Sequence, residues 1–321
     1  MEHLRGDDPV RIGPYTVLGR FDSGSRSGTA PGPRYIARSA DGDRTVLVCL
    51  PCAGVDPSRW AAEARHACGL SVPGLLPVDE VGGTPAAPWY AAPYAAALPL
   101  PDAVMAHGGP LPEPFVRAMG AALASSLRAA HAGGVVHAGL SPAAVLVTPG
   151  GIRLAGFGTV RSAGADGEHR GNAPGLDHGS LPPEQMTGGR PRPLGDVYGI
   201  GAVLSYASTG HTAPEREEIP EGLRAVITAC LARDPAQRPE AAALEAEFTA
   251  RAGRAAPDAG AVPGAAGPQA TVLDAPFAVA LPPRAAVALA RVAAAVLAAE
   301  PPGNPAQPRG AHSSLVTGTL D

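Results

Sequence analysis

The spacing of apolar residues divides the chain into a β-rich first part and a helical second part. Between residues 13 and 94, short runs rich in β-branched and aromatic residues are separated by turn residues, which is typical of strands joined by hairpins. A helix is predicted over 57–70, because Asp56 suits the N-cap and Pro57 the first helical position. Strands are predicted at YTVLGRF (15–21), PRYIARS (33–39), RTVLVCLP (44–51), LLPVDEV (75–81) and PWYAAPY (88–94).

After about residue 101 the apolar residues recur with a helical period. Within residues 113–134, Phe115, Met119, Leu123 and Leu127 fall on one stripe of a helix. Further helices are predicted at DVYGIGAVLSYASTG (196–210), GLRAVITACLARDP (222–235) and PEAAALEAEFTA (239–250). The first of these three is apolar almost all round, so we expect it to be buried. The fold class that follows is α+β and bilobal.

These elements predict a chain with one folded domain and less regular ends. We expect a loose N-terminus over residues 1–11, a small strand-rich lobe over about 12–93 and a larger helical lobe over about 94–250. Residues 251–275 are an Ala/Gly/Pro stretch with few large apolar groups, and we expect a disordered linker there. Residues 276–321 are expected to form a helix, about 283–300, and a polar tail. That helix could dock on a partner, but folding back on the domain is the favoured interpretation.

Composition and charge narrow the classes of function. Hydrophobic residues make up 45% and charged residues 17% of the chain, as in globular proteins. The net charge of −4 offers no basic field for nucleic acid or an anionic membrane. All 25 basic residues are Arg, so the chain has no Lys, and Asn occurs only at Asn172 and Asn304. The lack of Lys and the scarcity of Asn limit the chemistry that the chain can perform.

The sequence gives little support for a membrane or secretory location. The apolar stretch 285–299 is interrupted by Arg291, whereas a membrane span needs roughly 20 apolar residues. An Arg at the centre of a span costs ~2.5–3.5 kcal/mol on insertion scales. The first residues, MEHLRGDDPVRIGPY, contain no apolar run of the kind found in signal peptides. We therefore expect a cytoplasmic protein without membrane contact.

Four residues form a pattern that at first resembles a zinc site. Cys49 and Cys52 form a CxxC pair, and His66 and Cys68 follow after thirteen intervening residues. On a helix, however, residues two apart diverge by about 200°, so His66 and Cys68 cannot easily chelate one ion together. We interpret the cysteines as small thiols, since disulfides are also uncommon in the cytosol.

Six motifs occur in the order found in bacterial serine/threonine protein kinases, and together the chain resembles that family over roughly 240 of 321 residues. They are RTVLVCL (44–50), similar to the strand with the phosphate-binding Lys; HAGLSPAAV (137–145), similar to the catalytic loop HRDLKPxNV; GFGTVR (156–161), similar to DFG; LPPEQMTGG (181–189), similar to APE; PLGDVYGIGAVLSYASTG (193–210), similar to the buried helix; and CLARDPAQRPEAAAL (230–244), similar to the closing helix pair. The resemblance implies a bilobal protein kinase-like fold.

The same resemblance implies that the groups for phosphoryl transfer are missing. The family uses a strand Lys for the phosphates, a loop Asp as base, and an Asn and the DFG Asp for magnesium. The corresponding positions here are Cys49 for the strand Lys, Gly139 for the base, Ser141 for the loop Lys, Ala144 for the Asn, and Gly156 for the DFG Asp. None of these side chains provides the charge or the metal-ligating oxygen that the reaction requires.

The loop that would cover a nucleotide is also altered. GRFDSG (19–24) keeps Gly19 and Gly24 of the family's Gly-x-Gly-x-x-Gly pattern but has Phe21 at the middle glycine. A bulky ring hinders close approach of the backbone to phosphates, and the carboxylate of Asp22 would repel them. We therefore expect Mg-ATP binding to be absent or weak.

Positions that hold the kinase fold together are retained. Glu184 and Arg238 match a buried ion pair, and Asp196 matches the acid that anchors the backbone of the catalytic loop. His137, Phe157 and Gly158 match positions at the junction of the lobes, where packing is expected. Glu63 matches the helix glutamate, but without its usual Lys a solvated helix face is an equal interpretation.

These observations favour a pseudokinase, a kinase-fold protein that binds or scaffolds without phosphotransfer. The alternatives are a serine/threonine kinase with atypical ATP handling and a decayed gene product. The partner implied by the resemblance is a protein, either a catalytic sister kinase or another regulatory protein. No catalytic residue, metal or cofactor is expected.

Overall fold

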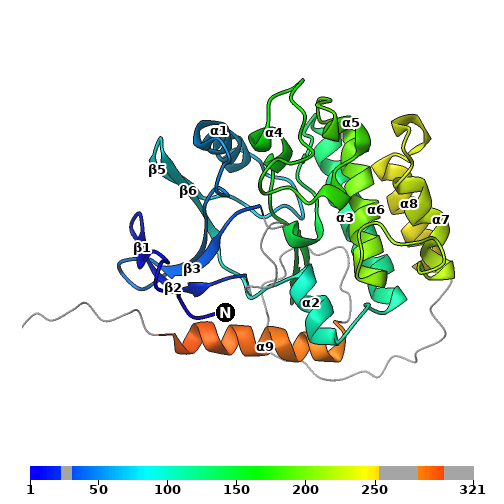
Figure 1. The fold of residues 1–321 in the computed structure, drawn as a ribbon. Helices are drawn as coiled ribbons and strands as arrows, with labels where there is room; N and C mark the ends of the chain where they lie inside the picture. The colour runs from blue at the N-terminus through cyan, green and yellow to red at the C-terminus, as the bar shows by residue number, and fades with distance from the viewer. Residues whose placement is uncertain (23–30, 253–280, 300–321) are drawn as a thin grey trace, which may run out of the picture.

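The structure is a computed structural model that describes residues 1–22, 31–252 and 281–299. A strand-rich first lobe and a helical second lobe lie side by side (Figure 1). In the described part of the first lobe, six strands form one antiparallel sheet in the order β1-β2-β3-β4-β6-β5. The strands are β1 Arg11–Ile12, β2 Tyr15–Arg20, β3 Arg34–Arg38, β4 Thr45–Cys49, β5 Glu80–Thr84 and β6 Ala87–Pro93.

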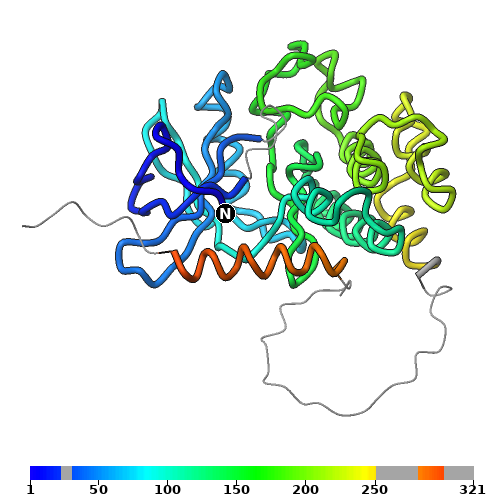
Figure 2. Tube along the Cα trace, turned by 60° about the horizontal axis from the view of Figure 1, so that its bottom comes forward, coloured from blue at the N-terminus to red at the C-terminus, as the bar shows by residue number. Residues whose placement is uncertain are grey.

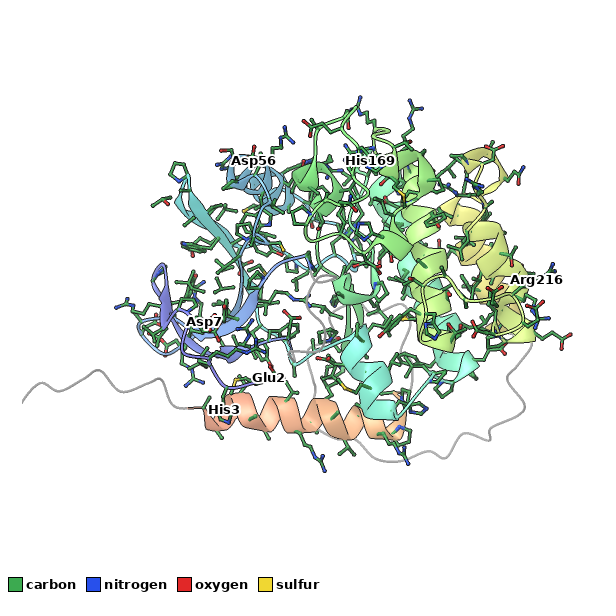
Figure 3. The ribbon with its side chains drawn as sticks, in the orientation of Figure 1. Glu2, His3, Asp7, Asp56, His169 and Arg216 are labelled. Atoms are coloured by element: carbon green, nitrogen blue, oxygen red, sulfur yellow. The ribbon has the colours of Figure 1, made fainter. Side chains whose placement is uncertain are left out.

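Helix α1, Pro57–Cys68, covers one face of this sheet. The carboxylate of Asp56 accepts hydrogen bonds from the backbone N–H groups of Ser58 and Arg59 at 2.8 and 3.2 Å, so the predicted N-cap is confirmed (Figure 3). The buried face of α1, including Trp60 and Ala64, packs against apolar residues of β3 and β4. Stacking of Trp60 on Tyr90, with ring centroids 5.3 Å apart, fixes the helix to β6.

One strand prediction is wrong for most of its length. Of the stretch 75–81, only Glu80 and Val81 belong to β5. The preceding residues bond instead to the second lobe, since the N–H of Leu76 donates to the carbonyl of Leu154 at 2.7 Å. Apolar residues in a short run therefore serve as a junction between the lobes rather than as a strand of the sheet.

The N-terminal residues, expected to be loose, are bonded to the outer edge of the sheet. Glu2 and Arg20 exchange two backbone hydrogen bonds, each 3.0 Å long. Asp8 accepts hydrogen bonds from the Arg20 guanidinium at 2.6 Å and from the Tyr35 hydroxyl at 2.8 Å. Glu2 and His3 thus lie between the sheet and the C-terminal helix (Figure 3). The segment shields the edge of β2, where unpaired backbone groups would otherwise be exposed.

The second lobe is built around two long helices and a small sheet. Its elements are β7 Leu98–Pro99, α2 Leu100–His107, α3 Glu113–Ala132, β8 Val145–Thr148, β9 Gly151–Leu154, α4 Thr159–Ala163, α5 Pro183–Met186, α6 Pro193–Thr209, α7 Glu221–Cys230 and α8 Ala241–Ala252. The predicted stripe of α3 is buried throughout, and α6 is buried over most of its surface. Gly120 lets α8 approach α3, because a Cβ atom there would lie 2.7 Å from the ring of Phe248.

The C-terminal helix α9, Pro283–Ala298, folds back onto both lobes (Figure 2). Leu289 belongs to the apolar core of the second lobe, whereas Val296 belongs to the apolar cluster between the sheet and α1. The Arg38 guanidinium of β3 donates to the carbonyls of Val296 and Ala299 at 3.4 and 3.3 Å, a favourable place for a cation at a helix C-terminus. The observed bounds of α9 agree with the helix predicted at about 283–300. The expected linker at 251–275 lies outside the described residues from 253 onward, and so does the expected tail from residue 300.

Within the described ranges, no helix is long and apolar enough to cross a bilayer.

Truncation of Leu289 should show that α9 is part of the fold. Leu289→Ala removes a side chain that is 4% exposed, and we expect the free energy of unfolding in urea to fall by about 2–3 kcal/mol. Leu297→Ala is the matched control, because Leu297 lies on the same helix and is 84% exposed. Equal stability of the two variants would contradict docking of α9.

Candidate functional site

A cavity of about 960 Å³ lies between the two lobes, at the place of the nucleotide cleft in protein kinases. Its walls come from β3 and β4 of the sheet, from α1, and from β8 and β9 of the second lobe. Among the described residues that line it, none is Asp, Glu, Asn, Gln or His. The described lining therefore has none of the carboxylate side chains through which proteins usually bind magnesium.

Cys49 ends β4 at the wall of this cavity, where the resemblance places the phosphate-binding Lys. It is 3% exposed and stands opposite Tyr90 in the register of β4 and β6. Burial raises the pKa of the Cys49 thiol to about 12. Its side chain is thus a neutral thiol at physiological pH, with neither the charge nor the reach to hold a phosphate.

Gly139 and Gly156, at the positions of the family's base and DFG Asp, lie next to each other, and Ala144 lies beside Gly156. A Cβ atom built on Gly139 would overlap the carbonyl oxygen of Gly156. A Cβ atom on Gly156 would lie 3.4 Å from that of Ala144, and Gly156 has a φ of 77°, where side chains are strained. Ser141 precedes the short helix at 142–144 and is 9% exposed. The loop and the GFG segment therefore lie in contact at Gly139, where a larger residue would displace the backbone of Gly156.

Arg34 on β3 is a buried cation in the cleft that the sequence did not single out. Its guanidinium pairs with Asp22, with Nε 3.0 Å from both carboxylate oxygens and Nη2 bonded to Oδ1. Nη1 donates to the carbonyl of Ala143 at 3.1 Å, and the group lies 5.1 Å from the ring centroid of Phe21. Burial alone would lower the pKa of Arg34, but the Asp22 carboxylate outweighs it and raises the pKa.

This cluster reverses the expected role of Asp22 and explains Phe21. Asp22 was expected to repel phosphates, yet its charge is neutralised by Arg34, which is 3% exposed. Phe21 is buried under the same guanidinium. Gly19 lies in β2 beneath Glu2, and Gly24 lies outside the described residues. The sequence held only a weak signal for this pair, an Arg among apolar residues of a strand.

Glu63 on α1 does not lie on a solvated face. Its carboxylate accepts a hydrogen bond from Arg161 of α4, Nε to Oε2, at 2.8 Å. The Arg161 guanidinium lies 4.8 Å from the ring centroid of Phe157, and Phe157 packs edge-on against His137 at 6.0 Å. Gly158 lies directly beneath Glu63, where a Cβ atom would collide with that side chain. Arg161 thus replaces the missing strand Lys as the partner of the helix glutamate.

Asp196 at the start of α6 binds the backbone of the loop, as expected. Its two oxygens accept hydrogen bonds from the N–H groups of His137 and Ala138, both at 2.8 Å, and Oδ2 lies 2.9 Å from Nε2 of His131. Ala138 has a φ of 53° and is the one non-glycine residue with positive φ in the described ranges. Such a conformation costs of order 1 kcal/mol or more and persists only when its surroundings hold it.

The expected ion pair between Glu184 and Arg238 is also present. The guanidinium binds both carboxylate oxygens, at 2.7 and 2.9 Å. Arg238 further donates to the carbonyls of Ala232 and Leu194 at 2.8 and 3.0 Å. The pair ties α5 to the segment that precedes α8.

A second buried arginine, Arg170, orders the segment between the GFG motif and α5 from within. Its side chain is fully buried and donates to four backbone carbonyls and to Asp166. The accepting carbonyls belong to Gly164, Ala165, Gln185 and Gly189. No motif marked Arg170, because its partners are backbone groups that leave no trace in side-chain spacing.

The zinc pattern finds no support in the geometry. Among the described residues, no group of three or more His, Cys, Asp or Glu side chains could hold a metal ion. Cys49 is buried in the cleft, whereas Cys68 is exposed on α1.

Comparison with known proteins gives the class of this fold. No protein family model matches the chain. It is 29% identical over 270 residues to the serine/threonine-protein kinase AfsK of Streptomyces coelicolor, covering 77% of this chain and 33% of that protein. It is 32% identical over 233 residues to the serine/threonine-protein kinase PknK of Mycobacterium tuberculosis, covering 63% of this chain and 20% of that protein. The chain therefore spans about a third or less of these relatives.

A solved structure shows the same fold. The kinase domain of PknI from M. tuberculosis superposes with a TM-score of 0.55 and 22% sequence identity, over 75% of this chain and 96% of that domain. The architecture is thus a protein kinase-like fold. The chain is also 30% identical over 273 residues to the probable serine/threonine-protein kinase PkwA of Thermomonospora curvata, covering 78% of this chain and 36% of that protein. The chain therefore belongs to the bacterial serine/threonine protein kinase family.

Burial of His137 predicts a loss of stability in acid. Burial lowers the pKa of His137 from 6.5 to about 4. Between these values the unfolded chain takes up a proton that the folded chain does not, so stability falls as the pH drops from 6.5 to 4, by up to about 3 kcal/mol. His137→Phe should flatten the dependence of the unfolding free energy on pH over this interval. The exposed His178→Phe is the control, and parallel curves for both variants and the parent chain would refute the prediction.

Proposed function

We propose that this chain is a pseudokinase, a kinase-fold module that binds a protein partner and does not transfer phosphate. The observation that carries the proposal is the make-up of the loop and the GFG segment: Gly139, Ala144 and Gly156 offer no carboxylate or amide side chain, and a Cβ atom on Gly139 would overlap the carbonyl oxygen of Gly156. General acid–base help alone contributes ~10²–10⁴-fold in rate. Without that base, the metal ligands and the phosphate cation, the electrostatic stabilisation of phosphoryl transfer is lost.

The groups present in the cleft do not fit a magnesium nucleotide. Arg34 is neutralised by Asp22, and the described lining has no carboxylate or amide side chain to ligate a metal. The retained contacts of Asp196, Glu184 and Arg238 hold the fold, which supports a role in binding rather than in chemistry. A protein partner, such as a catalytic kinase or another regulatory protein, is the class that a kinase-like surface without catalysis suggests.

Thermal stability in the presence of Mg-ATP tests the absence of nucleotide binding. A ligand at 100 times its dissociation constant would stabilise by ~2.7 kcal/mol, which is roughly 5–10 °C in Tm for a domain of this size. We expect no rise in Tm with millimolar Mg-ATP. A clear rise, or transfer of radiolabelled phosphate that survives purification controls, would overturn the proposal in favour of an active kinase with atypical ATP handling.

Restoring the family's base should damage the fold instead of reviving catalysis. Gly139→Asp introduces a Cβ atom onto the carbonyl of Gly156, and we expect a loss of about 1–3 kcal/mol in unfolding free energy with no gain of phosphotransfer. Gly150→Asp is the control, because Gly150 is exposed and has room for a Cβ atom. If Gly139→Asp were as stable as the parent chain, the closed geometry of the loop would be wrong.

A further inference from the structure

We propose that the C-terminal helix α9 is a brace across the connection between the two lobes, and that its first-lobe end detaches while its second-lobe end stays docked. Detachment frees the angle between the lobes, so α9 acts as a conformational switch. The inference goes beyond the proposed function and is independent of it, because the brace acts whether or not the chain transfers phosphate. It is carried by three features of α9: its position, the spacing of its anchors, and the unequal hold on its two ends.

The helix α9 runs beneath both lobes, on the side of the molecule opposite α1 and α4 (Figure 1). The chain passes from the first lobe to the second between β6 and β7, where residues 95–97 are three alanines with no bulky side chain to stiffen the connection. Beside it, the N–H of Tyr94 donates to the carbonyl of Thr45 at 3.2 Å, and Thr45 pairs with Arg38 in the register of β3 and β4. Because Arg38 also bonds to the end of α9, the helix lies next to this connection.

The two buried anchors of α9 fall on one face of the helix. Leu289 and Val296 are seven residues apart, which is two turns less about 20° and about 10 Å along the helix axis. Both are 4% exposed, yet Leu289 belongs to the core of the second lobe, whereas Val296 belongs to the cluster that includes Leu47 and Trp60 of the first. Since the rise of a helix is fixed, docking of both anchors fixes the separation of the two surfaces that receive them.

The end of α9 on the second lobe is held by several contacts. Three partly buried side chains of this segment pack against the same core as Leu289; they are Leu281, Ala288 and Val292. The Arg284 guanidinium adds a hydrogen bond to the carbonyl of His107, the last residue of α2, at 3.2 Å. Packing and a hydrogen bond therefore act together at this end.

The end of α9 on the first lobe has a weaker hold. Past Leu289, Val296 is the one buried side chain of the helix, and the next residue, Leu297, is 84% exposed. The hydrogen bonds from Arg38 to the last carbonyls measure 3.3 and 3.4 Å, longer than the usual 2.7–3.2 Å of N–H···O bonds. This end is therefore the one that detaches first.

Two buried thiols distinguish a movement of the lobes from unfolding of the chain. Cys49 belongs to the same apolar cluster as Val296, together with Leu146 and Ala155 of the second lobe, and is 3% exposed. Burial raises the pKa of its thiol to about 12, so the reactive thiolate is scarce while the lobes stay together. Detachment of α9 from this cluster exposes Cys49. Cys230 lies in the core of the second lobe with no exposed surface, so its modification reports global unfolding.

Thiol labelling of the full chain tests the brace. Cys52→Ser and Cys68→Ser remove the two thiols that are not buried and leave Cys49 and Cys230. In this background, Val296→Ala removes the first-lobe anchor. We expect N-ethylmaleimide to modify Cys49 about 5–30-fold faster, as for a loss of one or two kcal/mol in a local closing equilibrium, with the rate at Cys230 unchanged. Mass spectrometry of digested samples locates the label.

Each variant has a matched control. Leu297→Ala makes a similar truncation at the next residue of the helix, which is exposed, and should label like the parent background. Arg38→Met tests the same end of α9 should Val296→Ala fail to fold; it keeps the aliphatic stem and removes the cation at the helix C-terminus, which predicts labelling of Cys49 about 2–5-fold faster. Arg11→Met, at an exposed arginine of β1 in the same sheet, is its control.

Three outcomes count against the brace. Labelling of Cys49 at the parent rate in both Val296→Ala and Arg38→Met would show that the first-lobe end does not hold the lobes. Equal acceleration at Cys49 and Cys230 would show that α9 supports the whole fold and has no separable end. Acceleration in the controls as large as in their matched variants would remove the link to α9. Phosphotransfer does not enter these rates, so a failure of the proposed function is detected separately.

Discussion

The buried carboxylate of Asp196 is the interaction on which the arrangement between the lobes depends. By accepting hydrogen bonds from the backbone of His137 and Ala138, it stabilises a loop conformation that Ala138 would not adopt alone. The carbonyls of these two residues then accept hydrogen bonds from Gly158 and Val160, both at 2.8 Å. The GFG segment is therefore positioned by the loop, and α1 is positioned in turn by the GFG segment.

Two arginine side chains make contacts that join the two lobes. Arg161 takes up the carboxylate of Glu63, and Arg34 links the strand after the glycine loop to Ala143. Each bond uses a guanidinium group, which donates hydrogen bonds in a fixed fork geometry. The described walls of the cavity between the two lobes are mostly apolar, and the cation of Arg34 in them is paired with Asp22.

Much of the fold could be predicted from the sequence, because its signals are local. The capping by Asp56, the stripe of α3 and the spacing of the kinase-like motifs are properties of neighbouring residues. The sequence misled where a short apolar run could serve two purposes, as at Leu76, and where long-range bonds hold a polar segment, as at Asp8. In the candidate site, the lack of the family's catalytic side chains could be predicted directly from the sequence. The cation at Arg34 could not, because its burial is decided by a partner in another element.

The inward-facing Arg170 has a consequence for how the surface around α5 is presented. Some activation loops become ordered only when they are phosphorylated, so the surface that they form depends on that modification. Here the order comes from a side chain that bonds to the segment's own carbonyls, among them those of Gly164 and Gly189. The conformation of this segment is thus stabilised by a residue of the chain itself. A molecule that recognised this face would therefore meet a segment whose order comes from Arg170, a residue of the chain itself.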